Sequence, residues 1–76
     1  MSRWKPCKRR IFIRKLHGLG FDGPFSGTKH QFKIHANRRL AIPSNEDYSV
    51  SQLKFMLKEV ESIIGEKIIR SKWDSL

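Results

Sequence analysis

Acidic side chains are nearly missing from the first 45 residues of this 76-residue chain, which contain one acid, Asp22, and eleven lysines and arginines. Residues 46–76 hold six acids and five basic residues, so the formal net charge of +9 is concentrated in one part of the chain. A one-sided positive field attracts polyanions, and its main effect on nucleic acid is sequence-independent binding of phosphates. A run of basic residues can also be only a solvated helix face. Two separate basic clusters favour the anionic partner.

Cysteine and long apolar runs are also scarce. Cys7 is the one cysteine, so a disulfide within the chain is excluded, which fits a reducing cytosol. The sequence shows no apolar run long enough to cross a bilayer and no signal-type segment, so we expect a cytoplasmic protein without a membrane partner. A chain of this length predicts a single domain over residues 1–76, which buries only roughly 60% of its extended surface and has no room for a large cleft.

Apolar spacing predicts the first helix. Phe12, Leu16 and Leu19 recur at intervals of four and three residues, which is typical of a helix over about residues 8–18 with basic residues on its outer face. Gly18 and Gly20 lie at the end of this stretch and are expected to stop the helix, as glycines commonly do.

Three short strands are expected next. Residues 21–26 predict an edge strand or an irregular strand, because a Gly-Pro pair within them cannot complete a central ladder. Residues 30–35 and 38–42 alternate in polarity, which predicts a hairpin that turns at Ala36 and Asn37. The apolar face expected for this hairpin consists of Phe32, Ile34, Leu40 and Ile42.

The last element has the clearest local signals. Ser49 and Gln52 have the spacing of a capping box, and an apolar stripe follows them as far as Gly65. The stripe consists of Val50, Leu53, Met56, Leu57, Val60, Ile63 and Ile64. Residues 66–76 can either extend this helix or form a tail. A helix, three antiparallel strands and a second helix predict an α+β fold with both helices on one sheet face.

A histidine stands at the entrance of the predicted hairpin. Gly27 and Thr28 form a glycine-led turn, and Lys29 and His30 follow it among cations. A positioned histidine can take and return a proton near neutral pH, and surrounding cations suit it to a phosphodiester substrate. The residues expected to bind the phosphates of such a substrate are Lys29, Lys33, Arg38, Arg39, Arg10 and Arg14.

Four short motifs, in this order and spacing, resemble the HicA (YcfA-like) mRNA interferase toxins. The motifs are Gly20-Phe21, Gly27-Thr28-Lys29-His30-Gln31-Phe32, Arg39-Leu40-Ala41-Ile42-Pro43, and Leu53-Lys54-Phe55-Met56-Leu57-Lys58. The resemblance covers about residues 8–60. It implies a fold like the double-stranded RNA-binding domain, cleavage of mRNA by one histidine, and a HicB-type antitoxin as the protein partner.

The family's catalytic histidine corresponds to His30. Lys29 stands between the Gly-Thr pair and this histidine, and in an alternative alignment Lys29 itself occupies the histidine position. By strand parity, His30 would also lie on the face of Phe32 and Ile34, so a core-closing role is the competing interpretation. His17 and His35 are expected to be surface residues without a role.

RNA cleavage of this kind needs neither a metal nor a cofactor. The ribose 2′-hydroxyl is the nucleophile, so the protein need only move protons and stabilise the phosphorane charge. The acids and histidines of the sequence have no recognisable metal-ligand spacing. Together with the activity that the resemblance implies, this predicts a metal-independent endoribonuclease. A non-catalytic RNA-binding domain of the same fold is the alternative, and a module that docks an acidic protein is a weaker third possibility.

Overall fold

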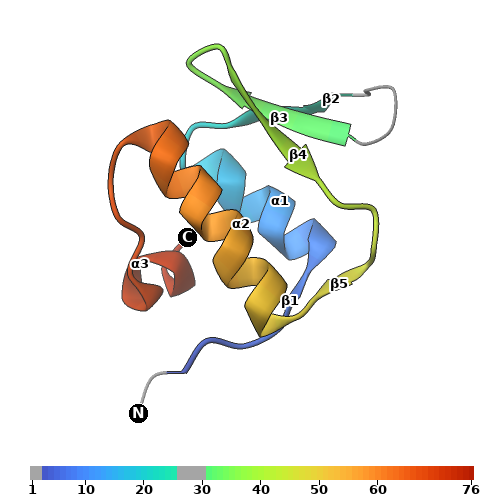
Figure 1. Ribbon diagram of the computed structural model, residues 1–76, viewed down its shortest axis with the longest axis vertical. Coiled ribbons are helices and arrows are strands. Elements are labelled where there is room, and N and C mark those ends of the chain that lie inside the picture. Colours follow the sequence, from blue (N-terminus) through green and yellow to red (C-terminus); the bar gives the residue numbers. More distant parts are fainter. Residues whose placement is uncertain (1–2, 26–30) are drawn as a thin grey trace.

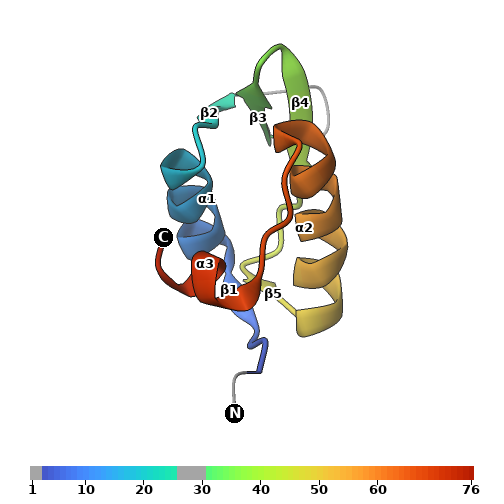
Figure 2. The same ribbon diagram turned by 90° about the vertical axis from the view of Figure 1, so that its left-hand side faces the viewer.

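The computed structural model describes residues 3–25 and 31–76 of the chain (Figure 1). Its elements in chain order are β1 (Cys7–Lys8), α1 (Arg9–Gly18), β2 (Asp22–Phe25), β3 (Gln31–His35), β4 (Arg38–Ile42), β5 (Asp47–Tyr48), α2 (Val50–Ile64) and α3 (Arg70–Asp74). The predicted α+β class is confirmed. The antiparallel sheet β2–β3–β4 lies at one end of the molecule, and α1 and α2 lie below it (Figures 1 and 2).

Helix α2 forms for the reasons that its sequence indicates. The Ser49 hydroxyl accepts a hydrogen bond from the Gln52 backbone N–H at 3.1 Å, so the predicted cap is confirmed. Gly65 ends the helix with φ of 76°, a left-handed conformation that a residue with a Cβ rarely adopts. The stripe then buries Leu53 and Val60 completely.

The C-terminal segment folds back onto the core instead of extending α2. Trp73 of α3 is buried, and its ring packs on Phe12 of α1 at 5.6 Å between centroids. The Lys15 ammonium lies 5.1 Å from the Trp73 ring centre and donates a hydrogen bond to the Trp73 carbonyl at 2.8 Å. Glu61 of α2 accepts from the Ile68 backbone N–H at 2.6 Å. These contacts connect the last eleven residues to both long helices.

Strands β1 and β5 form a short antiparallel pair that sequence reasoning did not predict. Cys7 is the register partner of Tyr48, and both side chains are buried. The Tyr48 ring meets Phe12 edge-on at 5.5 Å, and its hydroxyl donates to the Pro43 carbonyl at 2.7 Å. Burial raises the pKa of the Tyr48 hydroxyl. This pair fixes the entry of α1 beside the exit of β4.

The β3–β4 hairpin differs from expectation in its register. The turn at Ala36 and Asn37 is confirmed, with φ of 49° and 68°. It pairs Lys33 with Leu40 and Phe32 with Ala41. Paired residues share a face of the sheet, so the apolar residues of β3 and those of β4 lie on opposite faces. The prediction of one apolar face was wrong.

We call the side of the sheet toward the helices its inner face and the opposite side its outer face. Leu40 and Ile42 on the inner face are 1% and 0% exposed. The paired residues put Asp22, Phe25, Phe32, Ile34, Arg39 and Ala41 on the outer face. The register of β2 shifts between Asp22 and Phe25, which brings both onto that face although three positions separate them. Strand β2 is an edge strand, as predicted.

Candidate nucleic-acid interface

Arg9 connects three parts of the chain at the start of α1. Its Nε donates a hydrogen bond to the Pro43 carbonyl at 3.1 Å, and its Nη2 donates to the side-chain oxygen of Gln31. Gln31 is the first residue of β3, and Pro43 follows the last residue of β4. The start of α1 therefore lies beside the open end of the hairpin, opposite the Ala36–Asn37 turn.

A shallow, open hollow of about 490 Å³ lies at this junction, and we call it the basic hollow. Its lining residues are Lys8, Arg9, Arg10, Ser44 and Glu46. Three cations and one carboxylate give the hollow a net positive charge, and the Ser44 hydroxyl adds a hydrogen-bond donor. Such a combination suits the oxygens of a phosphate.

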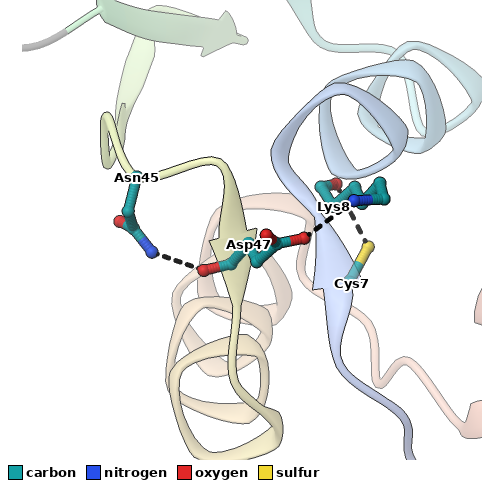
Figure 3. Close-up of polar contacts among 4 residues, drawn as sticks. All are labelled: Cys7, Lys8, Asn45 and Asp47. Atoms are coloured by element: carbon teal, nitrogen blue, oxygen red, sulfur yellow. Dashed lines mark hydrogen bonds and ion pairs between the residues drawn. The ribbon is translucent and has the colours of Figure 1, made fainter.

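Lys8 of the hollow forms an ion pair with Asp47 of the neighbouring strand β5 (Figure 3). Lys8 Nζ lies 3.1 Å from an Asp47 carboxylate oxygen, and both side chains are more than half exposed. Asn45 donates a hydrogen bond to the Asp47 carbonyl at 2.6 Å, which steadies the same strand. Because Asp47 partly neutralises Lys8, Arg9 and Arg10 supply most of the positive field.

Two of the predicted phosphate-binding residues lie on the exposed side of α1. Arg10 lines the basic hollow, and Arg14 follows it one helical turn later. Both side chains are exposed. The first turn of α1 holds no acidic residue, so its cations lie at the helix end where the dipole disfavours them.

The position of Lys33 differs from the expectation. It was expected to bind phosphate, but its side chain is 0% exposed on the inner face of the sheet. Its ammonium donates a hydrogen bond to the Gly23 carbonyl at 3.3 Å. Burial lowers the pKa of Lys33, and the nearby Asp22 carboxylate partly opposes that change. A buried ammonium cannot contact a phosphate in this conformation.

Arg38 and Arg39 do not act as a pair, because neighbouring residues of a strand point to opposite faces. Arg38 Nη1 donates to the Ser62 carbonyl in the last turn of α2 at 3.2 Å. There it satisfies a terminal carbonyl and supplies the cation that the end of α2 otherwise lacks. Arg39 lies on the outer face, with its guanidinium carbon 4.5 Å from the Phe32 ring centre. Both side chains are exposed.

The catalytic prediction falls outside the described residues. Gly27, Thr28, Lys29 and His30 all belong to the segment 26–30. The first described residue after this segment is Gln31, whose side chain accepts the hydrogen bond from Arg9.

The two other histidines differ from each other. His17 is exposed on α1, as expected. His35 was expected at the surface but is half-buried, with its ring 5.2 Å from that of Phe21. Its Nδ1 is buried and has no hydrogen-bond partner within the described parts of the chain. The register of β3 places His35 on the inner face, where it contacts Phe21 in the connection between α1 and β2.

Sequence reasoning missed Arg9 and the aromatic residues of the outer face. No local pattern marks Arg9, because its partners are 22 and 34 residues away. The outer face did have a signal. A two-residue turn at Ala36 and Asn37 requires that Phe32 and Leu40 lie on opposite faces.

Comparisons with known proteins do not place the chain in a family. No family model, curated protein or solved structure matches it. Within residues 3–25 and 31–76, no group of three histidine, cysteine, aspartate or glutamate side chains could hold a metal ion. Among the same residues, no helix has the length and apolar character needed to cross a membrane.

Proposed function

We propose that this protein is a metal-independent endoribonuclease that acts on mRNA as the toxin of a toxin–antitoxin pair, with His30 as its proton-transfer residue. The observation that carries the proposal is the basic hollow beside the start of β3. Arg9 of the hollow contacts Gln31, which directly follows His30 in the chain. The resemblance of four ordered motifs to the HicA toxins supports the same activity.

The proposed reaction uses the nucleophile that RNA already contains. The 2′-oxygen forms a bond to phosphorus while the bond from phosphorus to the 5′-oxygen breaks. His30 takes the proton of the 2′-hydroxyl, and the leaving 5′-oxygen takes up a proton from water. Arg9 and Arg10 stabilise the charge on the phosphorane oxygens. The products are a 2′,3′-cyclic phosphate and a 5′-hydroxyl, and DNA is spared because it lacks the nucleophile.

A second candidate is a non-catalytic RNA-binding domain. Two of the cations expected near His30 have other positions, since Lys33 is buried and Arg38 binds the end of α2. The remaining surface cations can hold phosphates without completing a catalytic arrangement. Salt-dependent binding of RNA without cleavage is the signature of this alternative.

Cleavage in the presence of a chelator separates the two candidates. We expect the purified protein to cut mRNA in EDTA and His30→Ala to reduce the rate at least about a hundredfold, the lower range for a positioned acid–base group. His17→Ala is the matched control, because His17 is an exposed histidine of α1. Lys29→Ala tests the alternative alignment. A His30→Ala protein that cleaves at the wild-type rate, or cleavage that requires magnesium, would contradict the mechanism.

The proposed protein partner is a HicB-type antitoxin. A net charge of +9 favours an acidic surface on such a partner. Expression of the toxin alone is expected to stop growth, and co-expression of an acidic protein encoded in the neighbouring reading frame is expected to restore it. Growth that is unaffected by the toxin would count against this pairing.

A further inference from the structure

The outer face of the sheet presents two aromatic rings side by side. Phe25 and Phe32 are cross-strand partners, with ring centroids 5.8 Å apart and planes tilted by 37°. Phe25 is 44% exposed, and Phe32 is half-buried. The helices lie on the inner side of the sheet (Figure 2), whereas the register places both rings on its outer face.

A cation extends this pair into a row. The Arg39 guanidinium lies over the Phe32 ring, with its central carbon 4.5 Å from the ring centre. Phe25, Phe32 and Arg39 therefore contribute one planar group from each of the three strands. We call this row the stacking row. Ala41 is the cross-strand partner of Phe32 and is exposed, so a small side chain adjoins the central ring.

We propose that the stacking row binds the unpaired bases of single-stranded RNA. This inference rests on the proposed function for RNA as the ligand. It adds that the protein recognises single-stranded rather than double-stranded RNA. Exposed aromatic side chains on a sheet stack with bases that are splayed out of a single strand, and arginine planes do the same. A duplex keeps its bases stacked on one another, so it cannot use such a row.

The charge of the row favours nucleic acid over an apolar protein surface. Arg39 places a cation within the aromatic patch, and the chain as a whole carries +9. Docking an apolar partner would take that cation out of water, which is costly. A polyanion instead gains from it, because its bases stack on the rings while a phosphate contacts the guanidinium.

The test separates stacking from phosphate binding and from cleavage. The probes are a short 2′-O-methyl oligouridylate, whose blocked 2′-oxygen prevents cleavage, and an abasic oligomer of the same length and charge. Wild-type protein should bind the base-bearing oligomer about 5- to 150-fold more tightly, the range for one base on one aromatic side chain. Phe32→Leu should lower this ratio at least about fivefold, the lower limit for one stacked base, and leave the affinity for the abasic oligomer unchanged.

Two further variants keep the test independent of folding defects. Phe25→Leu changes a more exposed ring of the same row and should also lower the ratio. Phe55→Leu is the matched control, because Phe55 is 67% exposed on α2 and lies outside the sheet. It should leave the ratio at the wild-type value.

Each remaining outcome overturns the stacking row. A wild-type ratio of one, with salt-dependent binding of both oligomers, would remove the row and leave the proposed RNA function standing. Tighter binding of a duplex than of the single strand would do the same. Loss of antitoxin binding in Phe25→Leu and Phe32→Leu, with the ratio unchanged, would make the face a protein-docking surface. Failure of both oligomers to bind would refute the proposed function as well.

Discussion

The helical half of the molecule and the three-stranded sheet distribute their side chains in different ways. In the helical half, with which we include the β1–β5 pair, Phe12, Tyr48 and Trp73 pack ring against ring and are buried. In the sheet, the inner face buries Lys33 while Phe25 stays 44% exposed on the outer face. Burial of apolar surface is the main source of stability, so the helical half supplies most of it. Lys33 and Phe25 depart from this pattern, and such departures are typical of functional sites.

Removal of Trp73 should produce the largest loss of stability. Trp73→Ala leaves a cavity against Phe12 and removes the contacts of Lys15, which should lower the free energy of unfolding by about 3–5 kcal/mol. A domain of 76 residues has in total only about 4–11 kcal/mol at the usual value per residue. Urea denaturation measures the change. Phe32→Leu on the sheet is the comparison variant, and equal losses in both would contradict the division of roles.

The contrast also explains which parts of the fold could be predicted from the sequence. Helix α2 was predicted closely because its signals are local: a serine cap, an apolar stripe and Gly65. Helix α3 was left open, because Trp73 is ordered by Phe12 and Lys15, about 60 residues earlier in the chain. The β1–β5 pair was missed for the same reason, since two residues per strand give no periodic pattern.

The hairpin shows a failure that the sequence itself could have prevented. Alternation correctly predicted two strands and a turn at Ala36 and Asn37. A two-residue turn, however, fixes the register and sends Phe32 to the face opposite Leu40. One apolar face requires Phe32 and Leu40 on the same side, whereas this turn places them on opposite sides. In the structure the turn geometry decides the register.

The candidate site was predicted in part. Arg10 and Arg14 are exposed, as a basic helix face requires. Lys33 was misplaced because its role depended on the wrong register. Arg9 could not have been singled out, because its importance lies in hydrogen bonds to Gln31 and Pro43 rather than in any neighbour in sequence.

Replacement of the buried lysine by an apolar residue should make the inner face of the sheet as apolar as the core of the helical half. Lys33→Met removes an ammonium that is buried with one hydrogen bond to the Gly23 carbonyl. An apolar residue of similar length should stabilise the fold by about 1 kcal/mol at neutral pH, equivalent to roughly 4–8 °C in Tm. A lower Tm would show that the hydrogen bond outweighs the desolvation of the charge.

The same variant makes a prediction about pH. Because the folded state lowers the pKa of Lys33 below its ordinary value near 10.5, the unfolded chain binds more protons between the two values. The contribution of Lys33 to wild-type stability should therefore rise as the pH increases through that window. Lys33→Met should lose this rise, and chemical denaturation at neutral and alkaline pH measures the difference.

The two adjacent arginines of β4 are expected to have different roles, Arg38 in stability and Arg39 in RNA binding. Arg38→Ala removes the hydrogen bond to the Ser62 carbonyl and should lower the free energy of unfolding by about 0.5–1.5 kcal/mol. Arg39→Ala should leave stability nearly unchanged, weaken RNA binding about equally across sequences and reduce the salt slope by about one. Thermal melting and RNA titrations at several salt concentrations measure both effects. An exchange of these two phenotypes would contradict the assignment of faces.

Arg10→Glu should give a small change in stability, and its sign is opposite to that of most surface mutations. Arg10 lies in the first turn of α1, where a carboxylate interacts favourably with the helix dipole by about 0.3–1 kcal/mol. The same change places a negative charge in the basic hollow and should weaken RNA binding. Arg14→Glu is the matched control, because it has the same charge change one turn later, where the dipole effect is smaller. Both variants should bind RNA less tightly, and Arg10→Glu alone should melt at a higher temperature than wild type. If Arg10→Glu is instead less stable than wild type, Arg10 stabilises the fold. Its position in the first turn of α1 would then be explained by stability, and not by the binding of an anion.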